Sequence, residues 1–439
     1  MNLYKELRLN FNSLSLNRLV DFLRVFDDVL LLNSNSEILK NNSDIGFMLA
    51  IDKAKSLTIN NSHSDSFLSL REFHSRYKDY LFGHLSYDLK EEIENLSSEN
   101  RDEIKMPLMN FFVPELMLKF ESGILKCLLF HENSAHYKGV CNEILKVLKN
   151  ANFQDPFYVK RSFEINLKSR ISKAEYFTQF KKIKNNIQKG DIYEMNFCQE
   201  FYSDNALIDP FELYLNLNKI SPSPFSAFYR INNKFLISSS PERYLQKKGS
   251  KIISQPIKGT APRMKSAIED LIAKENLRNN LKERAENVMI VDLVRNDLSR
   301  TAAKASVKVD ELCEIYSFKQ VHQMISTISS ILSPKFDFVD VLRTSFPMGS
   351  MTGAPKIRAM QFIENYETSK RGLYSGAIGY VSPNGDFDFS VVIRSIIYNS
   401  QNKYLSFMVG GAITDGSDPQ FEYDECLLKA KGIIESLNS

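Results

Sequence analysis

The chain has 439 residues, of which 43% are hydrophobic and 25% are charged. This composition is typical of a globular protein with a sizeable core, and it excludes disordered, collagen-like and membrane-spanning proteins. Because 56 Lys and Arg residues face 53 Asp and Glu residues, the net charge of +3 gives no reason to expect nucleic acid or anionic lipid as a partner. No membrane association is expected either.

The cysteines and the start of the chain predict a cytoplasmic protein. The five cysteines are widely spread and form no CxxC pair, which favours reduced thiols over a disulfide framework or a zinc site. The start, MNLYKELRLNFNSLSLNRLV, carries charges and asparagines where a signal peptide requires an apolar run.

The first 160 residues mix short apolar runs with turn residues. The runs 47–51 and 116–120 are predicted as strands, and apolar spacing predicts helices over 17–32 and 137–148. Asparagines and a proline between 148 and 163 favour a connection there. We therefore expect an N-terminal part over 1–160 and a catalytic part over 161–439.

The pattern sharpens from Ser172 onward. Ser172 is a typical N-cap and Gly190 a typical stop for a helix over 173–188. Further helices are predicted over 265–297, 355–366 and 421–437. Strands are predicted over 194–201, 225–231, 234–240, 243–248, 251–257, 374–381, 388–398 and 403–409. Short turns between these strands favour antiparallel sheet, so we predict an α+β fold rather than a doubly wound one.

Glu242 and Lys258 flank a hairpin turn predicted at residues 247–251. Both are equally distant from position 250, so the pattern predicts that they face each other across two strands. A carboxyl and an amine this close could serve as general acid and nucleophile. The alternative is a cross-strand ion pair at the surface.

Two acidic segments are candidates for a metal site. Glu422 and Glu425 would lie on one face of the last helix, with Lys429 close to Glu422 in angle. Carboxylate oxygens are suitable ligands for Mg2+, although a solvated acidic helix face is the alternative. Glu286 lies in an apolar helix, where a buried carboxylate needs a partner or a metal.

Glycine-rich segments suggest a place for an anion. Residues 349–356 lack the GxxxxGK[ST] spacing, which excludes ATP binding of the P-loop type, but a glycine turn before a helix suits a carboxylate. Gly410 and Gly411 would let backbone amides approach an anion, with a tight turn as the alternative. Arg394 is a charge within an apolar strand. His322 alone indicates nothing, because a lone histidine is usually structural.

Taken together, these segments resemble the chorismate-utilising enzymes, which include anthranilate synthase component I, aminodeoxychorismate synthase component I and the isochorismate synthases. The resemblance covers residues 172–439 in the family's order and is thinner before them, at FGHLSYDL and VPEL. Its stretches are GDIYEMN, SSSPER, PIKGTAPR, RAENVMIVDLVRNDLSR, FPMGSMTGAPKIRAM, RGLYSGAIGY and GGAITDGSDPQFEYDE.

The resemblance implies a fold of two packed antiparallel sheets flanked by helices, and it implies roles for the residues that match. Glu242 would be the general acid that assists loss of the C4 hydroxyl of chorismate, and His322 an active-site histidine. The carboxylates implied as Mg2+ ligands are Glu286, Glu422 and Glu425. The residues implied in holding substrate carboxylates or the metal's surroundings are Thr352, Tyr380, Arg394, Gly410, Gly411 and Lys429.

Lys258 decides between the members of this family. PIKGT resembles the aminodeoxychorismate synthases, in which the lysine is proposed to attack C2 before ammonia enters at C4, whereas anthranilate synthases have PI-[AS]-GT. The product would be 4-amino-4-deoxychorismate, a precursor of 4-aminobenzoate and folate. Since no amidotransferase signature is present, a separate glutamine amidotransferase subunit would supply the ammonia.

Three alternatives stay open. Anthranilate synthase component I would require that Lys258 does not dictate the reaction. Isochorismate synthase would require a lysine where Glu194 stands. A non-catalytic partner that binds chorismate or an amidotransferase would have no need of the whole set of acidic and basic residues. Glu194, where ammonia-using relatives usually have Gln, and Ala412, in place of a third glycine, depart from the family pattern.

Overall fold

The computed structural model describes residues 1–9, 13–35, 45–61, 65–131, 134–149, 165–319 and 321–439. Its α-helices within these ranges are α1 (Ser13–Phe22), α2 (Ser66–Tyr77), α3 (Lys90–Ile93), α4 (Ala135–Lys149), α5 (Lys173–Gln188), α6 (Pro210–Ile220), α7 (Ala267–Asn279), α8 (Leu281–Ser299), α9 (Phe338–Ser345), α10 (Lys356–Tyr366) and α11 (Pro419–Leu437). Short 3-10 helices are η1 (Leu23–Val25), η2 (Tyr87–Leu89) and η3 (Gly349–Met351).

The strands all join one hydrogen-bonded network, and the pairings between them are antiparallel. They are β1 (Asn2–Arg8), β2 (Asp28–Asn33), β3 (Ile45–Ile59), β4 (Leu81–Leu85), β5 (Met109–Glu121), β6 (Ile124–Leu129), β7 (Lys168–Ser169), β8 (Glu194–Ser203), β9 (Phe225–Ile231), β10 (Lys234–Ser240), β11 (Arg243–Lys248), β12 (Lys251–Gln255), β13 (Ile257–Pro262), β14 (Lys308–Ser317), β15 (Val321–Ile331), β16 (Gly353–Ala354), β17 (Ala377–Val381), β18 (Phe387–Val391), β19 (Ser395–Asn399) and β20 (Tyr404–Ile413). Antiparallel strands with helices packed outside them confirm the α+β prediction.

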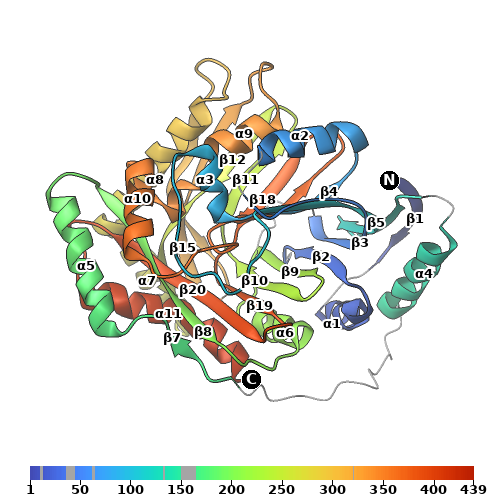
Figure 1. The fold of residues 1–439 in the computed structure, drawn as a ribbon, viewed down its shortest axis with the longest axis horizontal. Helices are drawn as coiled ribbons and strands as arrows, with labels where there is room; N and C mark the ends of the chain where they lie inside the picture. The colour runs from blue at the N-terminus through green and yellow to red at the C-terminus, as the bar shows by residue number, and fades with distance from the viewer. Residues whose placement is uncertain (10–12, 36–44, 62–64, 132–133, 150–164, 320) are drawn as a thin grey trace.

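Much of the sheet is buried on both faces. Along β2, Val29 and Leu31 join one core cluster and Leu30 joins the other, because successive side chains of a strand point to opposite faces. Helices α5, α6 and α11 pack against the first cluster, and α2, α8 and α9 against the second. In Figure 1, α5 and α11 lie along the β8–β20 side, and α2 lies beside α9 at the opposite end.

N-terminal and C-terminal strands pair directly with each other. β2 pairs with β9, and β4 pairs with β17, so the two parts of the chain contribute to the same sheet. The boundary expected at 160/161, with most of the connection around it, lies outside the described residues.

Most of the expected elements are present. Helix α5 has the predicted bounds, and a capping box in which Ser172 and Glu175 bond each other's backbone amides starts it. The helix expected over 137–148 lies within α4, and the strands expected over 47–51 and 116–120 lie within β3 and β5.

Four expected elements are wrong. The strand over 251–257 is divided at Pro256 between β12 and β13. The helix over 17–32 ends at Phe22, and its last residues form β2, which is hydrogen-bonded on both sides to β3 and β9. The helix over 265–297 is divided at Asn280, whose side chain caps α8. The strand over 388–398 is divided where Arg394 adopts a φ of 52°, a conformation that no continuous strand contains.

Candidate active site

β8, β13, β20, η3, α8 and α11 surround a cavity of about 120 Å³. The structure brings most of the predicted site residues together in its lining, namely Glu242, Lys258, Glu286, Arg394, Gly410, Gly411, Glu422, Glu425 and Lys429. They come from positions up to 187 residues apart (429 − 242), so the site exists only in the folded chain. A concave site with convergent charged groups is the usual setting for small-molecule chemistry.

Glu242 lies in the turn between β10 and β11 and is only 4% exposed. Ser350 Oγ donates a 2.6 Å hydrogen bond to its Oε1. Burial nevertheless raises the pKa of Glu242 to about 7, because the anion loses more hydration than its donors replace. A carboxyl with this pKa can hold a proton at neutral pH and donate it as a general acid.

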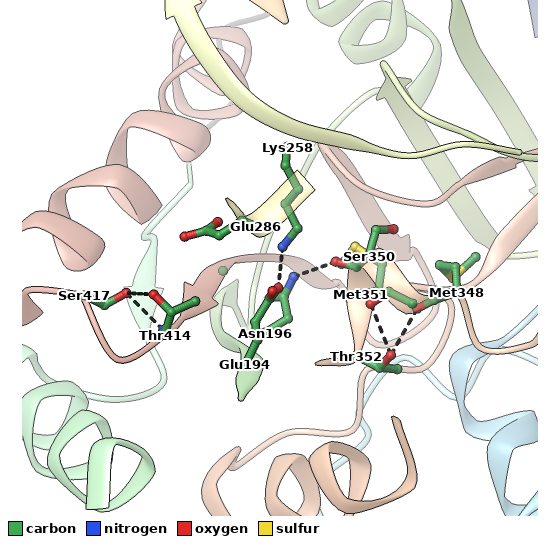
Figure 2. Close-up of polar contacts among 12 residues, drawn as sticks. Glu194, Asn196, Lys258, Glu286, Met348, Ser350, Met351, Thr352, Thr414 and Ser417 are labelled. Atoms are coloured by element: carbon green, nitrogen blue, oxygen red, sulfur yellow. Dashed lines mark hydrogen bonds and ion pairs between the residues drawn. The ribbon is translucent and has the colours of Figure 1, made fainter. Parts of the chain in front are cut away.

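Lys258 is paired with Glu194 rather than with Glu242. Its Nζ donates a 2.7 Å hydrogen bond to Glu194 Oε1, and Figure 2 shows the lysine pointing toward Glu194, with Glu286 beside it. Burial opposes the charged lysine, but Glu194, Glu286 and Glu242 outweigh it and raise the pKa of Lys258 above its ordinary value. Lys258 is therefore a cation in this structure.

The predicted cross-strand opposition of Glu242 and Lys258 is wrong, although both line the cavity. A bulge shifts the β11–β12 register, and β12 ends at Gln255, just before Pro256. Lys258 then belongs to β13, which pairs with β15 instead of β11.

The acidic residues of α8 and α11 face each other across the cavity. Lys282 Nζ lies between them, 2.6 Å from Glu422 Oε1 and 3.7 Å from Glu286 Oε1. Lys429 Nζ lies 2.8 Å from Glu425 Oε1 and donates to the carbonyl oxygen of Gly410 at 2.9 Å. Burial raises the pKa of Glu286 to about 7. Burial also opposes ionisation of Glu425, but Lys429, together with Lys282 and Lys258, outweighs it and lowers the pKa of Glu425.

The donor chemistry of this acidic cluster fits Mg2+. Carboxylates supply hard oxygen ligands, and Glu286 Oε1 is buried without a hydrogen-bond partner among the described residues. Within the same residues, no three His, Cys, Asp or Glu side chains are grouped closely enough to hold a metal ion. In this structure, the ammonium group of Lys282 is the cation paired with the Glu422 carboxylate.

Arg394 and the two glycines form the anion-binding side of the cavity. Among the described residues, none forms a hydrogen bond or ion pair with the Arg394 guanidinium, and burial lowers its pKa. A Cβ at Gly410 would collide with Cys198, so only glycine lets β20 lie this close to β8. A Cβ at Gly411 would lie 3.5 Å from Glu422 Oε2 and take up room in the site. Such an arrangement suits a ligand carboxylate.

The sequence matches the model of the chorismate binding enzyme family over residues 30–435. The chain belongs to this family. Aminodeoxychorismate synthase component 1 of Salmonella typhimurium is 34% identical over 361 residues, which cover 82% of this chain and 76% of that protein. Anthranilate synthase component 1 of Lactococcus lactis is 31% identical over 360 residues, which cover 80% and 78% of the two chains.

A solved structure of the same family has the same fold. Anthranilate synthase component I of Streptococcus pneumoniae superposes with a TM-score of 0.76 at 27% identity, covering 90% of this chain and 92% of that one. The family and fold inferred from the sequence motifs are thereby confirmed. No helix in the described part of the chain is long and apolar enough to cross a membrane, and all five cysteines are free and buried.

Three residues that the family resemblance suggested do not line the cavity. His322 is held by Ser317 and Asp270, through its Nδ1 and Nε2 respectively. Thr352 Oγ1 donates to backbone carbonyls of η3 and the residue before it (Figure 2). Tyr380 lines a separate cavity of about 340 Å³, which is larger but contains none of the site carboxylates.

Sequence reasoning missed several residues that build the site. Ser350 bonds Glu242, and Lys282 bonds Glu422. Arg371 donates to the carbonyl oxygens of Met351 and Asn196, which ties η3 to β8 behind the cavity. Ser350 lies within a recognised motif, but nothing in the pattern indicated which of its side chains would bond the acid.

Proposed function

We propose that this protein is the component I subunit of an aminodeoxychorismate synthase, which converts chorismate and ammonia to 4-amino-4-deoxychorismate. The observation that carries the proposal is Lys258, an amine in the same cavity as a carboxyl whose pKa is about 7, Glu242. The curated relatives with this name support it. The product would serve 4-aminobenzoate and folate synthesis.

The proposed chemistry follows from the positions of these groups. Lys258 Nζ gives up one proton and bonds to C2, while Glu242 gives its proton to the C4 hydroxyl, which leaves as water. Ammonia then bonds to C4 as the bond between Nζ and C2 breaks, and the product amine returns a proton to Glu242. Arg394 and the backbone around Gly410 and Gly411 hold the carboxylates of chorismate.

Mg2+ would be held by Glu286, Glu422 and Glu425, whose side chains would have to lie closer together than they do in this structure. When bound, it would screen the charge of a substrate carboxylate. Ammonia would come from a separate glutamine amidotransferase subunit, consistent with the component 1 naming of the relatives. Free cysteine thiols favour the cytoplasm as the place of action.

Removing either partner of the ion pair between Lys282 and Glu422 should change the affinity for Mg2+, in opposite directions. Glu422→Ala removes a proposed ligand, and a loss of about 10-fold or more is expected. Lys282→Met removes the cation that competes for Glu422, so affinity should rise by on the order of tenfold. Titration calorimetry with Mg2+ alone measures both. Lys431→Met, at an exposed pair with Glu435, is the matched control and should change nothing. Unchanged affinity in Glu422→Ala would remove this residue from the metal site.

Product analysis tests the proposed function directly. Purified protein is incubated with chorismate, Mg2+ and ammonium, and half of the samples also receive aminodeoxychorismate lyase, before liquid chromatography and mass spectrometry. We expect 4-aminobenzoate only in samples with the lyase. Anthranilate without the lyase would make the protein an anthranilate synthase, as the Lactococcus and Streptococcus likenesses allow. No turnover of either kind would favour a chorismate-binding partner without catalysis.

A further inference from the structure

The buried contact between Glu194 and Lys258 lies outside the roles assigned above. We propose that Glu194 is the general base that takes a proton from Lys258 Nζ before the lysine attacks the substrate, and that it returns this proton at the end of turnover. The proposal rests on the proposed function, in which Lys258 is the nucleophile. Glu194 touches the reacting nitrogen, so it would be a catalytic residue.

Lys258 needs such a base because an ammonium group has no lone pair with which to attack carbon. Of the described residues, only Glu194 forms a hydrogen bond with its Nζ, at 2.7 Å. Glu242 also faces the lysine but must keep its proton for the leaving hydroxyl, and Glu286 faces it without a hydrogen bond. Glu283 and Glu425 also interact electrostatically with the lysine and likewise form no hydrogen bond with it.

The surroundings of Glu194 leave one of its oxygens without a partner among the described residues. Its side chain is 1% exposed, and its second oxygen, Oε2, is buried with no hydrogen-bond partner among the described residues. Lys258 is thus the one donor that stabilises the anion within this set, and protonation of Glu194 breaks no other hydrogen bond.

The backbone holds Glu194 in place for this exchange. β16 pairs with the first residues of β8, with Ala354 opposite Glu194. Gly353, at a φ of 147°, lies so close that a Cβ would collide with the Glu194 carbonyl oxygen. The glycine in the GSMTGAP segment therefore allows the strand contact that positions the base.

The protons balance over one turnover. Lys258 gives a proton to Glu194, and its lone pair forms the bond to C2 as the C4–O bond breaks and Glu242 protonates the departing hydroxyl. Ammonia forms the bond to C4, and the electrons of the breaking C2–N bond return to Lys258. Glu194 then gives its proton back to Lys258, and the product amine restores the proton of Glu242. The sum is chorismate plus ammonia giving amine plus water.

The first test is Glu194→Gln, which keeps the size and one acceptor oxygen but is not a base. Because ammonia-using relatives usually have Gln at this position, a loss of activity would show a role that this chain alone gives to the carboxylate. We expect kcat with ammonium to fall by about 10²- to 10⁴-fold, with chorismate and Mg2+ binding within a fewfold of the original protein. Glu200→Gln is the matched control, because Glu200 is a buried carboxylate of the same strand, paired with Arg170 outside the cavity. Its kcat should stay nearly unchanged. A Glu194→Gln enzyme with a normal kcat would overturn the proposal.

A second test separates a base from a mere counter-ion. Glu194→Ala removes the carboxyl, and added fluoroacetate, formate or acetate is tested for recovery of turnover. A base role predicts recovery that increases with the basicity of the added carboxylate, whereas recovery that is equal for all three would indicate only a missing negative charge. No recovery, with intact chorismate binding, would also contradict the proposal.

Failure of this inference can be told apart from failure of the proposed function. If Lys258→Ala turned over normally, or the product were anthranilate, the nucleophile itself would be wrong. If Lys258→Ala were inactive and aminodeoxychorismate the product, while Glu194→Gln kept its kcat, only the base assignment would fall.

Discussion

Lys258→Ala is expected to lower formation of aminodeoxychorismate by about 10³-fold or more, the size of loss that follows removal of an enzyme nucleophile. Among the described residues, no other lysine forms a hydrogen bond with Glu194, and Lys282 and Lys429 are instead held by carboxylates of α11. Chorismate should still bind, since Arg394 and the glycines of β20 are untouched. The measurements are lyase-coupled formation of 4-aminobenzoate and calorimetric binding of chorismate and Mg2+.

Lys356→Ala is the matched control for this variant. Lys356 is nearly as buried as Lys258, with side-chain exposures of 12% and 10%, and it is likewise paired with a buried carboxylate, Asp297. It does not line the cavity. We expect the control to lose stability but to keep its turnover per folded molecule. If Lys258→Ala lost no more activity than Lys356→Ala, the nucleophile would have to be sought elsewhere.

The sequence was sufficient to predict most of the charged residues that line the cavity, because those residues lie in motifs whose order is that of the family. It was insufficient to predict which partner each residue would meet. The pairing of Lys258 with Glu194 depends on a bulge between β11 and β12 and on the change of partner at Pro256. Neither is encoded in local spacing, since a register shift of one residue changes which side chains meet.

The local sequence pattern also did not predict which face of a strand each side chain would occupy. His322 and Gln323 are neighbours on β15, yet Gln323 lines the cavity and His322 points to Ser317 and Asp270. Successive strand residues face opposite sides, so a motif can be recognised correctly while the wrong member is chosen. In the same way, the apolar run 29–32 fits a helix or a buried strand equally well until its neighbours β3 and β9 are known.

Glu242→Gln is expected to lower kcat by about 10²- to 10⁴-fold, because the amide cannot protonate the departing C4 hydroxyl. The substitution preserves volume and an acceptor for Ser350 Oγ, so folding and chorismate binding should change little. Turnover with saturating chorismate and ammonium, together with the binding constant for chorismate, separates the two effects. A loss confined to KM would mean that Glu242 binds substrate rather than donating a proton.

The pKa of Glu242 predicts how turnover depends on pH. Burial raises the pKa of Glu242 to about 7, so the acid form is present below that value and is lost as the pH rises through it. Turnover of the unmodified enzyme should therefore fall above about pH 7 through loss of the general acid. Glu286 has a pKa in the same range, but a Mg2+ ligand acts as the anion, so its titration would raise turnover with pH rather than lower it. The Glu242→Gln variant tests the assignment: its remaining activity should lack the falling limb if Glu242 is the acid, and should keep it if another group is responsible.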